Sequence, residues 1–171
     1  YSFQFTLSPV VVDINNDGQK EIITAKTLQP SRKPVASKNH ITIFNSQGET
    51  IINFSAGERN VPIYPAVEDI IGDNKKEIVL ASRGDFESPP RIFAFSHTGE
   101  ILWEKIPEKF LTTTYPYPNP MGTSIADLDG DGLKEIIITI YNHKSLVGNN
   151  EESVIVVYVL NNKGDLFSEA W

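Results

Sequence analysis

Residues 127–135 read Asp127-Leu128-Asp129-Gly130-Asp131-Gly132-Leu133-Lys134-Glu135, and a run of branched apolar residues follows them directly. Carboxylates stand at positions 1, 3, 5 and 9 of this stretch, and a glycine stands at position 6. A tight loop brings alternate side chains to one side, and several oxygen ligands in flexible geometry are what Ca²⁺ prefers. The stretch therefore predicts a calcium loop that runs into a β-strand.

The same nine-residue frame occurs twice earlier in the chain. Residues 13–21 read Asp13-Ile14-Asn15-Asn16-Asp17-Gly18-Gln19-Lys20-Glu21, and residues 69–77 read Asp69-Ile70-Ile71-Gly72-Asp73-Asn74-Lys75-Lys76-Glu77. The first aspartate thus recurs after 56 and then 58 residues. Self-similarity at such a period is the signature of a repeat architecture, so the three loops predict three copies of one structural unit.

Each unit reads as four short strands separated by turn signals. The first strand covers about residues 9–14, 65–70 and 123–128, and the second begins at Lys20, Lys76 and Lys134. The third is an apolar run, and the fourth follows a glycine turn: Ile41–Phe44 and Thr50–Phe54, Ile92–Phe95 and Ile101–Trp103, and Val154–Leu160 and Leu166–Trp171. Four strands in a period above fifty residues are typical of one blade of a β-propeller.

The whole chain, residues 1–171, is therefore predicted to be an all-β, β-propeller segment of about three four-stranded blades. The repeats cover about 8–55, 64–106 and 122–171, and residues 1–5 read as the last strand of a preceding blade. A propeller ring needs roughly four to eight blades. Three blades therefore favour a fragment of a larger propeller, whose remaining blades come from the same longer chain or from other copies.

Composition excludes several classes of function. The net charge is −7, which argues against nucleic acid because phosphates require a basic surface. The chain has no cysteine, which removes disulfides, thiolate chemistry and cysteine-ligated zinc or iron–sulfur centres. No apolar run approaches the roughly 20 residues of a membrane-spanning helix.

The metal ligands follow from the loop positions, with the carbonyl of position 7 completing each set. The third loop offers Asp127, Asp129, Asp131, the Leu133 carbonyl and Glu135. The first offers Asp13, Asn15, Asp17, the Gln19 carbonyl and Glu21, and its neutral asparagine predicts somewhat weaker binding. The second keeps Asp69, Asp73, Lys75 and Glu77, but Ile71 at position 3 and two lysines predict a weak or empty site.

Two other interpretations of the loops exist. Asp, Asn and Gly also form ordinary β-turns without any metal. An EF-hand requires flanking helices and an acid at position 12, where this chain has Thr24, Leu80 and Ile138. The flanking segments are predicted strands, so the EF-hand is excluded and the ordinary turn remains as the alternative.

With these loops and strands, the units resemble the FG-GAP/VCBS-type repeats of integrin-α-like β-propellers, over essentially the whole chain. The resemblance implies Ca²⁺ between the first and second strands of each blade, on one rim. It also implies an extracellular or cell-surface location and a role in adhesion, carbohydrate binding or scaffolding. Ile71 and the missing phenylalanyl-glycyl signatures depart from that family, and residues 95–103 also look like blades of quinoprotein-type propellers.

The sequence favours a non-enzymatic module that presents loops to a protein or carbohydrate ligand on the rim opposite the calcium. Those loops are residues 27–39, 107–122 and 143–152. No nucleophile elbow, phosphate loop or metal-hydrolase pair is present, so no catalytic residue is assigned. The alternative is part of a propeller-type enzyme, either a polysaccharide lyase or a quinoprotein-like oxidoreductase.

Overall fold

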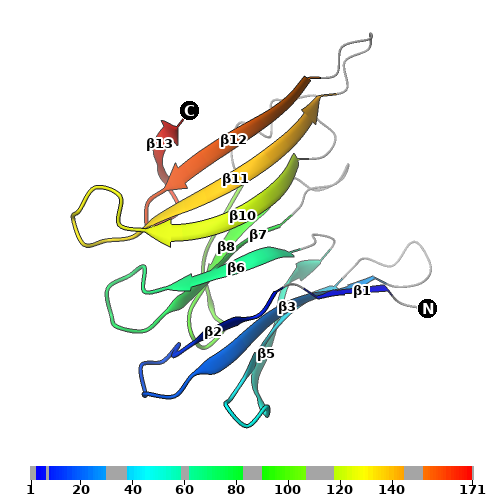
Figure 1. The fold of residues 1–171 in the computed structure, drawn as a ribbon, viewed down its shortest axis with the longest axis vertical. Helices are drawn as coiled ribbons and strands as arrows, with labels where there is room; N and C mark the ends of the chain where they lie inside the picture. The colour runs from blue at the N-terminus through cyan, green and yellow to red at the C-terminus, as the bar shows by residue number, and fades with distance from the viewer. Residues whose placement is uncertain are drawn as a thin grey trace.

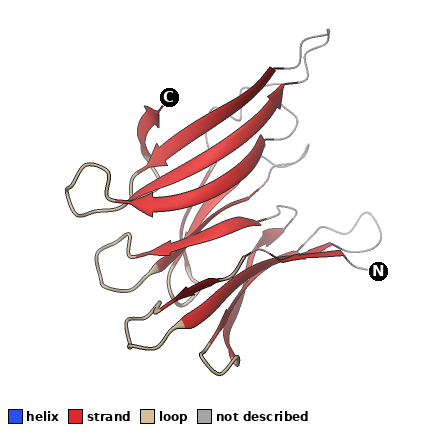
Figure 2. Cartoon of the chain, in the orientation of Figure 1, coloured by secondary structure: helices blue, strands red, loops and turns tan. Residues whose placement is uncertain are grey.

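The computed structural model describes residues 3–6, 8–29, 38–58, 62–82, 90–106, 118–144 and 152–170. Within these ranges every regular element is a β-strand, and the strands form three antiparallel sheets that follow one another in space (Figures 1 and 2). Among the same residues no helix is long and apolar enough to cross a membrane. The all-β prediction is confirmed.

Each sheet is built from consecutive strands. The first contains β1 (Phe3–Thr6), β2 (Val10–Val12), β3 (Glu21–Gln29), β4 (Lys38–Phe44) and β5 (Thr50–Glu58). The second contains β6 (Pro62–Glu68), β7 (Glu77–Ser82), β8 (Arg91–Phe95) and β9 (Ile101–Lys105). The third contains β10 (Pro118–Ala126), β11 (Glu135–Lys144), β12 (Glu152–Leu160) and β13 (Leu166–Ala170).

The predicted strands are present, with shifted ends. The second strand of every unit begins at the glutamate after the predicted lysine, because that glutamate is the ninth loop residue. Strands β4, β5 and β10 are longer than predicted, since polar and glycine residues continue the pairing beyond the apolar runs. Trp171, assigned from sequence to the last strand, lies outside the described residues.

Strand β1 corrects the prediction that residues 1–5 belong to a preceding blade. It pairs antiparallel with β3, from Phe3 opposite Gln29 to Thr6 opposite Lys26. Strand β2 pairs with the other end of β3, from Val10 opposite Ile23 to Val12 opposite Glu21. The reason is length: β3 has nine residues and β2 only three, so β1 satisfies the backbone groups that β2 leaves unpaired.

The second sheet is the middle layer and is covered on both faces. All six residues of β7 are buried. Because side chains alternate along a strand, Ile78 and Leu80 pack against the first sheet, while Val79 and Ala81 pack against the third. The β7 sequence is therefore apolar on both faces, as expected for a strand between two layers.

A glycine turn joins the last two strands of every sheet. In each, the N–H of the glycine donates to the carbonyl three residues earlier, in Asn45, Ser96 and Asn161 respectively. The turn of each later sheet rests on the last strand of the sheet before it. A Cβ on Gly99 would lie 2.6 Å from Phe54 of β5, and one on Gly164 would lie 2.9 Å from Trp103 of β9. Trp103 Nε1 also donates to the Asn162 carbonyl over 3.0 Å.

This packing predicts that Gly99→Ala destabilises the chain more than Gly48→Ala. Both glycines have a positive φ, +88° and +82°, so both substitutions carry similar backbone strain. Only the Gly99 variant also drives a methyl group into Phe54, and overpacking typically costs about 1–3 kcal/mol. Urea unfolding of the two variants measures the difference, and equal losses would contradict the packing of the second turn on β5.

Candidate metal centre

The three acidic loops lie at the same edge of the molecule, each joining the first strand of a sheet to the second (Figure 1). In every loop the position-9 glutamate turns inward and accepts a hydrogen bond from the position-2 N–H. The pairs are Glu21 with Ile14 at 3.0 Å, Glu77 with Ile70 at 2.9 Å, and Glu135 with Leu128 at 2.8 Å. These glutamates are buried, which fixes the loops to the start of the second strands.

The aspartates at positions 1 and 5 close each loop in the same way. The position-5 carboxylate accepts from the position-7 N–H, at 2.8, 2.8 and 2.7 Å in the three loops. The position-1 carboxylate accepts from the position-6 N–H, at 2.8, 2.8 and 3.0 Å. Positions 4 and 6 both have positive φ and hold only Gly or Asn, the residues that tolerate it. The repeated sequence frame thus produces a repeated local structure.

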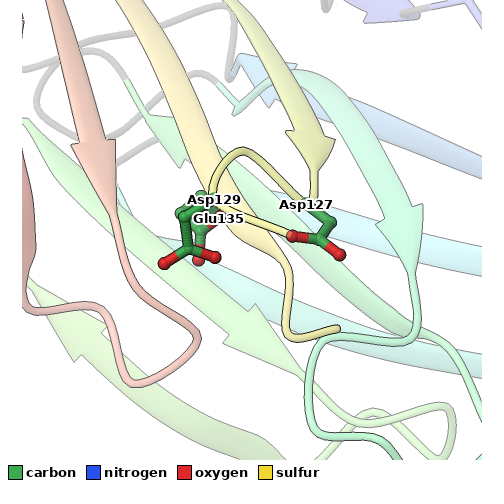
Figure 3. A group of neighbouring side chains, drawn as sticks. All are labelled: Asp127, Asp129 and Glu135. Carbon is green, nitrogen blue, oxygen red and sulfur yellow. The ribbon is translucent and has the colours of Figure 1, made fainter. Parts of the chain in front are cut away.

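In the third loop the carboxylates of Asp127, Asp129 and Glu135 come together. One oxygen from each lies within 4.8 Å of the others, so the three could hold a metal ion between them. Asp129 and Glu135 project beside each other from the loop and from the start of β11, and Asp127 lies across the loop from them (Figure 3). All donor atoms are carboxylate oxygens, the ligand type that hard cations take.

Asp131 is not part of this group. Its Oδ1 accepts from the Leu133 N–H at 2.7 Å, a loop-closing bond like those that Asp127 accepts from Gly130 and Gly132. The equivalent Asp17 and Asp73 do the same for Gln19 and Lys75. Ligation by Asp131 and by the position-7 carbonyls of Gln19, Lys75 and Leu133 stays a prediction.

Position 3 distinguishes the loops. Among the described residues, a group of three or more carboxylate, imidazole or thiol ligands forms only in the third loop. The first loop has Asn15 at this position, whose Oδ1 accepts from the Asp17 N–H at 3.2 Å. The second loop has Ile71, which is 46% exposed and offers no oxygen. A donor at position 3 is therefore what loop two lacks.

Hydrogen bonds within the chain close the second loop as they close the other two. Asp69 accepts from the N–H groups of Gly72, Asp73 and Asn74. The Lys76 ammonium pairs with Glu68, the residue before the loop, at 2.5 Å, and the Lys76 N–H donates to the Ile14 carbonyl at 2.8 Å. Burial alone would raise the pKa of Glu68, but the Lys76 hydrogen bond and the charges of Lys76 and Lys134 hold it below its ordinary value.

The environment of Glu77 disfavours the charged form of its carboxyl group. Burial raises the pKa of its carboxyl above the usual value, and the negative charges of Asp73 and Asp69 raise it further, while the Ile70 N–H partly opposes the rise. Folding therefore favours the protonated acid. Glu77 contributes most to stability below its unfolded pKa, and this contribution is lost as pH rises toward the folded value.

The expected result is that Glu77→Gln stabilises the chain at neutral pH, in the presence of a chelator. Glutamine keeps an oxygen acceptor for the Ile70 N–H and removes the buried charge. The gain should shrink as the pH falls below about 4, the ordinary range for a glutamate, because Glu77 is then neutral in both states. Unfolding by urea at the two pH values measures it, and a loss of stability at neutral pH would refute the interpretation.

One feature of these loops could not be predicted from the sequence, and another could have been. The inward turn of the position-9 glutamates depends on burial by neighbouring strands, which no local pattern encodes. The positive φ at position 4 could have been predicted. This position holds Asn16, Gly72 and Gly130, and glycine and asparagine are the residue types that adopt a positive φ most readily.

Comparison with known proteins identifies a fold relative but no family. No protein-family model matches the chain, and no curated protein sequence matches it. The structure is similar to the crystal structure of rhamnogalacturonan lyase YesW, with a TM-score of 0.56 and 13% sequence identity. The similarity covers 98% of this chain but only 42% of the lyase chain. At this identity the likeness concerns the fold.

Proposed function

We propose that the third loop binds Ca²⁺ through Asp127, Asp129 and Glu135. The observation that carries the proposal is the meeting of three carboxylates, one oxygen from each within 4.8 Å of the others, in a loop whose backbone N–H groups hold all three carboxylates in place. Calcium accepts six to eight oxygens at 2.3–2.6 Å in flexible geometry, so carbonyls and water can complete the shell. Magnesium demands a stricter octahedron and keeps its waters, which favours calcium here.

The metal acts as a brace. Asp127 follows β10 and Glu135 begins β11, so an ion between them ties two neighbouring strands together. Binding only to the folded chain stabilises it by mass action. Asp13, Asn15 and Glu21 of the first loop form a second, weaker site in this proposal. The second loop stays empty because Ile71 replaces the third ligand.

The chain as a whole is proposed to be a β-propeller segment of the FG-GAP/VCBS type, acting as a scaffold for a protein or carbohydrate ligand. The two sheet-to-sheet interfaces repeat one arrangement, and β6 contacts both β3 of the first sheet and β10 of the third, which supports a radial order. Extracellular calcium modules bind at about 10⁻⁴–10⁻³ M, so a weak structural site fits a location outside the cell. The opposite-rim loops that would bind the ligand lie largely outside the described residues.

A second candidate is part of a polysaccharide lyase. The fold likeness to a rhamnogalacturonan lyase over 98% of the chain favours it specifically. Incubation of the chain with rhamnogalacturonan, followed by ultraviolet absorbance of unsaturated products, separates the two candidates. Product formation would establish the lyase, whereas binding without product would support the scaffold.

Calcium removal should lower the melting temperature of the chain. A stabilisation of about 2.7 kcal/mol is expected at a calcium concentration a hundred times the dissociation constant. Thermal melts in excess Ca²⁺, in excess Mg²⁺ and with a chelator provide the measurement. Identical melting temperatures in calcium and chelator would reject the metal brace.

A further inference from the structure

A lysine stands directly before the position-9 glutamate in all three acidic loops, as Lys20, Lys76 and Lys134. An ammonium group pairs with the same carboxylates that hold a metal cation, so it competes with the metal if it enters the loop. Lys134 is the only basic residue between positions 127 and 135. Within the described part of the chain, however, it forms no ion pair with the carboxylates of the third loop. A partner that keeps its ammonium outside this loop would favour the metal.

Glu68, at the end of β6, is placed to be that partner. It occupies the register position that Val12 has at the end of β2 and Ala126 at the end of β10. Val12 packs on the core between the first and second sheets, so the same position in β6 faces the third sheet. In the second sheet alone, a carboxylate thus stands where the equivalent strands have apolar side chains.

The third loop comes close to the end of β6. The second and third loops are neighbours along one edge of the molecule (Figure 1). Ile70, two residues after Glu68, packs in one core with Ile136, two residues after Lys134. The position-8 N–H of the second loop donates to the position-2 carbonyl of the first at 2.8 Å, but among the described residues Lys134 makes no matching bond to Ile70. The contact between the second and third loops therefore depends on side chains.

The Glu68 carboxylate interacts with the lysines of both loops. Burial raises the pKa of its carboxyl, but the hydrogen bond from Lys76 and the charges of Lys76 and Lys134 lower it below the ordinary value. Its Oε1 accepts from the Lys76 ammonium at 2.5 Å and from the Asp69 N–H at 3.1 Å. Because Oε1 takes both bonds, Oε2 is the oxygen left for Lys134.

We propose that Glu68 is a positioning residue for the metal site of the third loop. It holds the Lys134 ammonium outside that loop and so leaves the three carboxylates of the loop to the cation. The inference rests on the Ca²⁺ site proposed above and extends it, because it makes a residue of the second sheet a determinant of metal affinity in the third. Metal binding is thereby linked to the joint between two sheets.

A double-mutant cycle in calcium affinity tests the proposal. Glu68→Gln should lower the affinity about two- to fivefold, which is the range that a partly exposed ion pair supports. In a Lys134→Gln background the same substitution should leave the affinity unchanged, because no ammonium remains to enter the loop. In a Lys76→Gln background it should keep its full cost. Competition with a fluorescent calcium chelator, at physiological ionic strength to screen distant charges, measures each affinity.

Two further variants separate this role from folding. Glu68→Val copies the side chain of Val12, so it suits the sheet-to-sheet packing and should show the same loss of affinity as Glu68→Gln. Asp165→Asn is the matched control, since Asp165 also pairs with a lysine across the second and third sheets, Lys105 at 2.7 Å, but in the glycine turn between β12 and β13. It should leave calcium affinity unchanged. Thermal melts in chelator establish that each variant is folded.

The cycle has outcomes that overturn the proposal. An equal loss from Glu68→Gln with and without Lys134 would show a general effect of charge, and no loss in either background would show that Glu68 has no role. Both results leave calcium binding by the wild-type chain intact, so they would reject only this inference. A wild-type chain that binds no calcium would instead reject the metal site, and the positioning role with it.

Discussion

Asp129→Asn should reduce the calcium affinity of the chain by about tenfold or more, equivalent to about 1.4 kcal/mol. Asp129 is one of three carboxylates that meet in the third loop, and the ligand charge count sets the affinity of calcium loops. The substitution keeps the shape of the loop, because the amide oxygen of Asn15 already fills the same position in the first loop and accepts the same backbone hydrogen bond. The lost affinity therefore measures ligation rather than folding.

Competition with a fluorescent calcium chelator measures this change. Glu100→Gln is the matched control, since it also removes one exposed negative charge but lies in the glycine turn between β8 and β9. Equal affinities for Asp129→Asn and the wild-type chain would exclude the third loop as the tightest site. A gain of binding in Ile71→Asp would further support position 3 as the deciding ligand.

Phe95→Ala should remove about 3–5 kcal/mol of stability, a large share of the roughly 5–15 kcal/mol that native domains have. Phe95 is fully buried between the first and second sheets. Its ring lies 4.9 Å from that of Phe54 and 5.7 Å from that of Phe93, so truncation leaves a cavity bordered by two aromatic rings. Both the transfer free energy and the aromatic contacts are lost.

Urea unfolding monitored by tryptophan fluorescence gives the cost. Phe167→Ala provides the control, because Phe167 is 45% exposed on β13 and its truncation should change stability by no more than about 0.5 kcal/mol. A Phe95→Ala chain as stable as the Phe167→Ala chain would show that the first two sheets do not share this core.

Local features of the chain were predictable from sequence. The three loops were found because their frame depends only on spacing within nine residues, and the strands after them because Lys-Glu-Ile is repeated. The glycine turns were found for the same reason, since Gly48, Gly99 and Gly164 each follow an apolar run. These elements depend on short-range geometry, which sequence records directly.

Features that depend on contacts between distant residues were not predictable. The pairing of β1 with β3 could be predicted only if it were known that β3 extends beyond the end of β2. The grouping of Asp127, Asp129 and Glu135 without Asp131 depends on the folded path of the loop, because all four carboxylates also accept backbone hydrogen bonds. The difference at position 3, which is Asn15, Ile71 or Asp129 in the three loops, was visible in the sequence. It indicated that the third loop has the most complete set of carboxylates, and this is the loop in which three carboxylates meet.

A crystal structure of the chain grown with calcium chloride tests the account most directly. The account predicts an ion in the third loop, at about 2.3–2.6 Å from carboxylate oxygens of Asp127, Asp129 and Glu135. It also predicts no ion in the loop that contains Ile71. A third loop without an ion at saturating calcium, or an ion held by other residues in its place, would contradict the account.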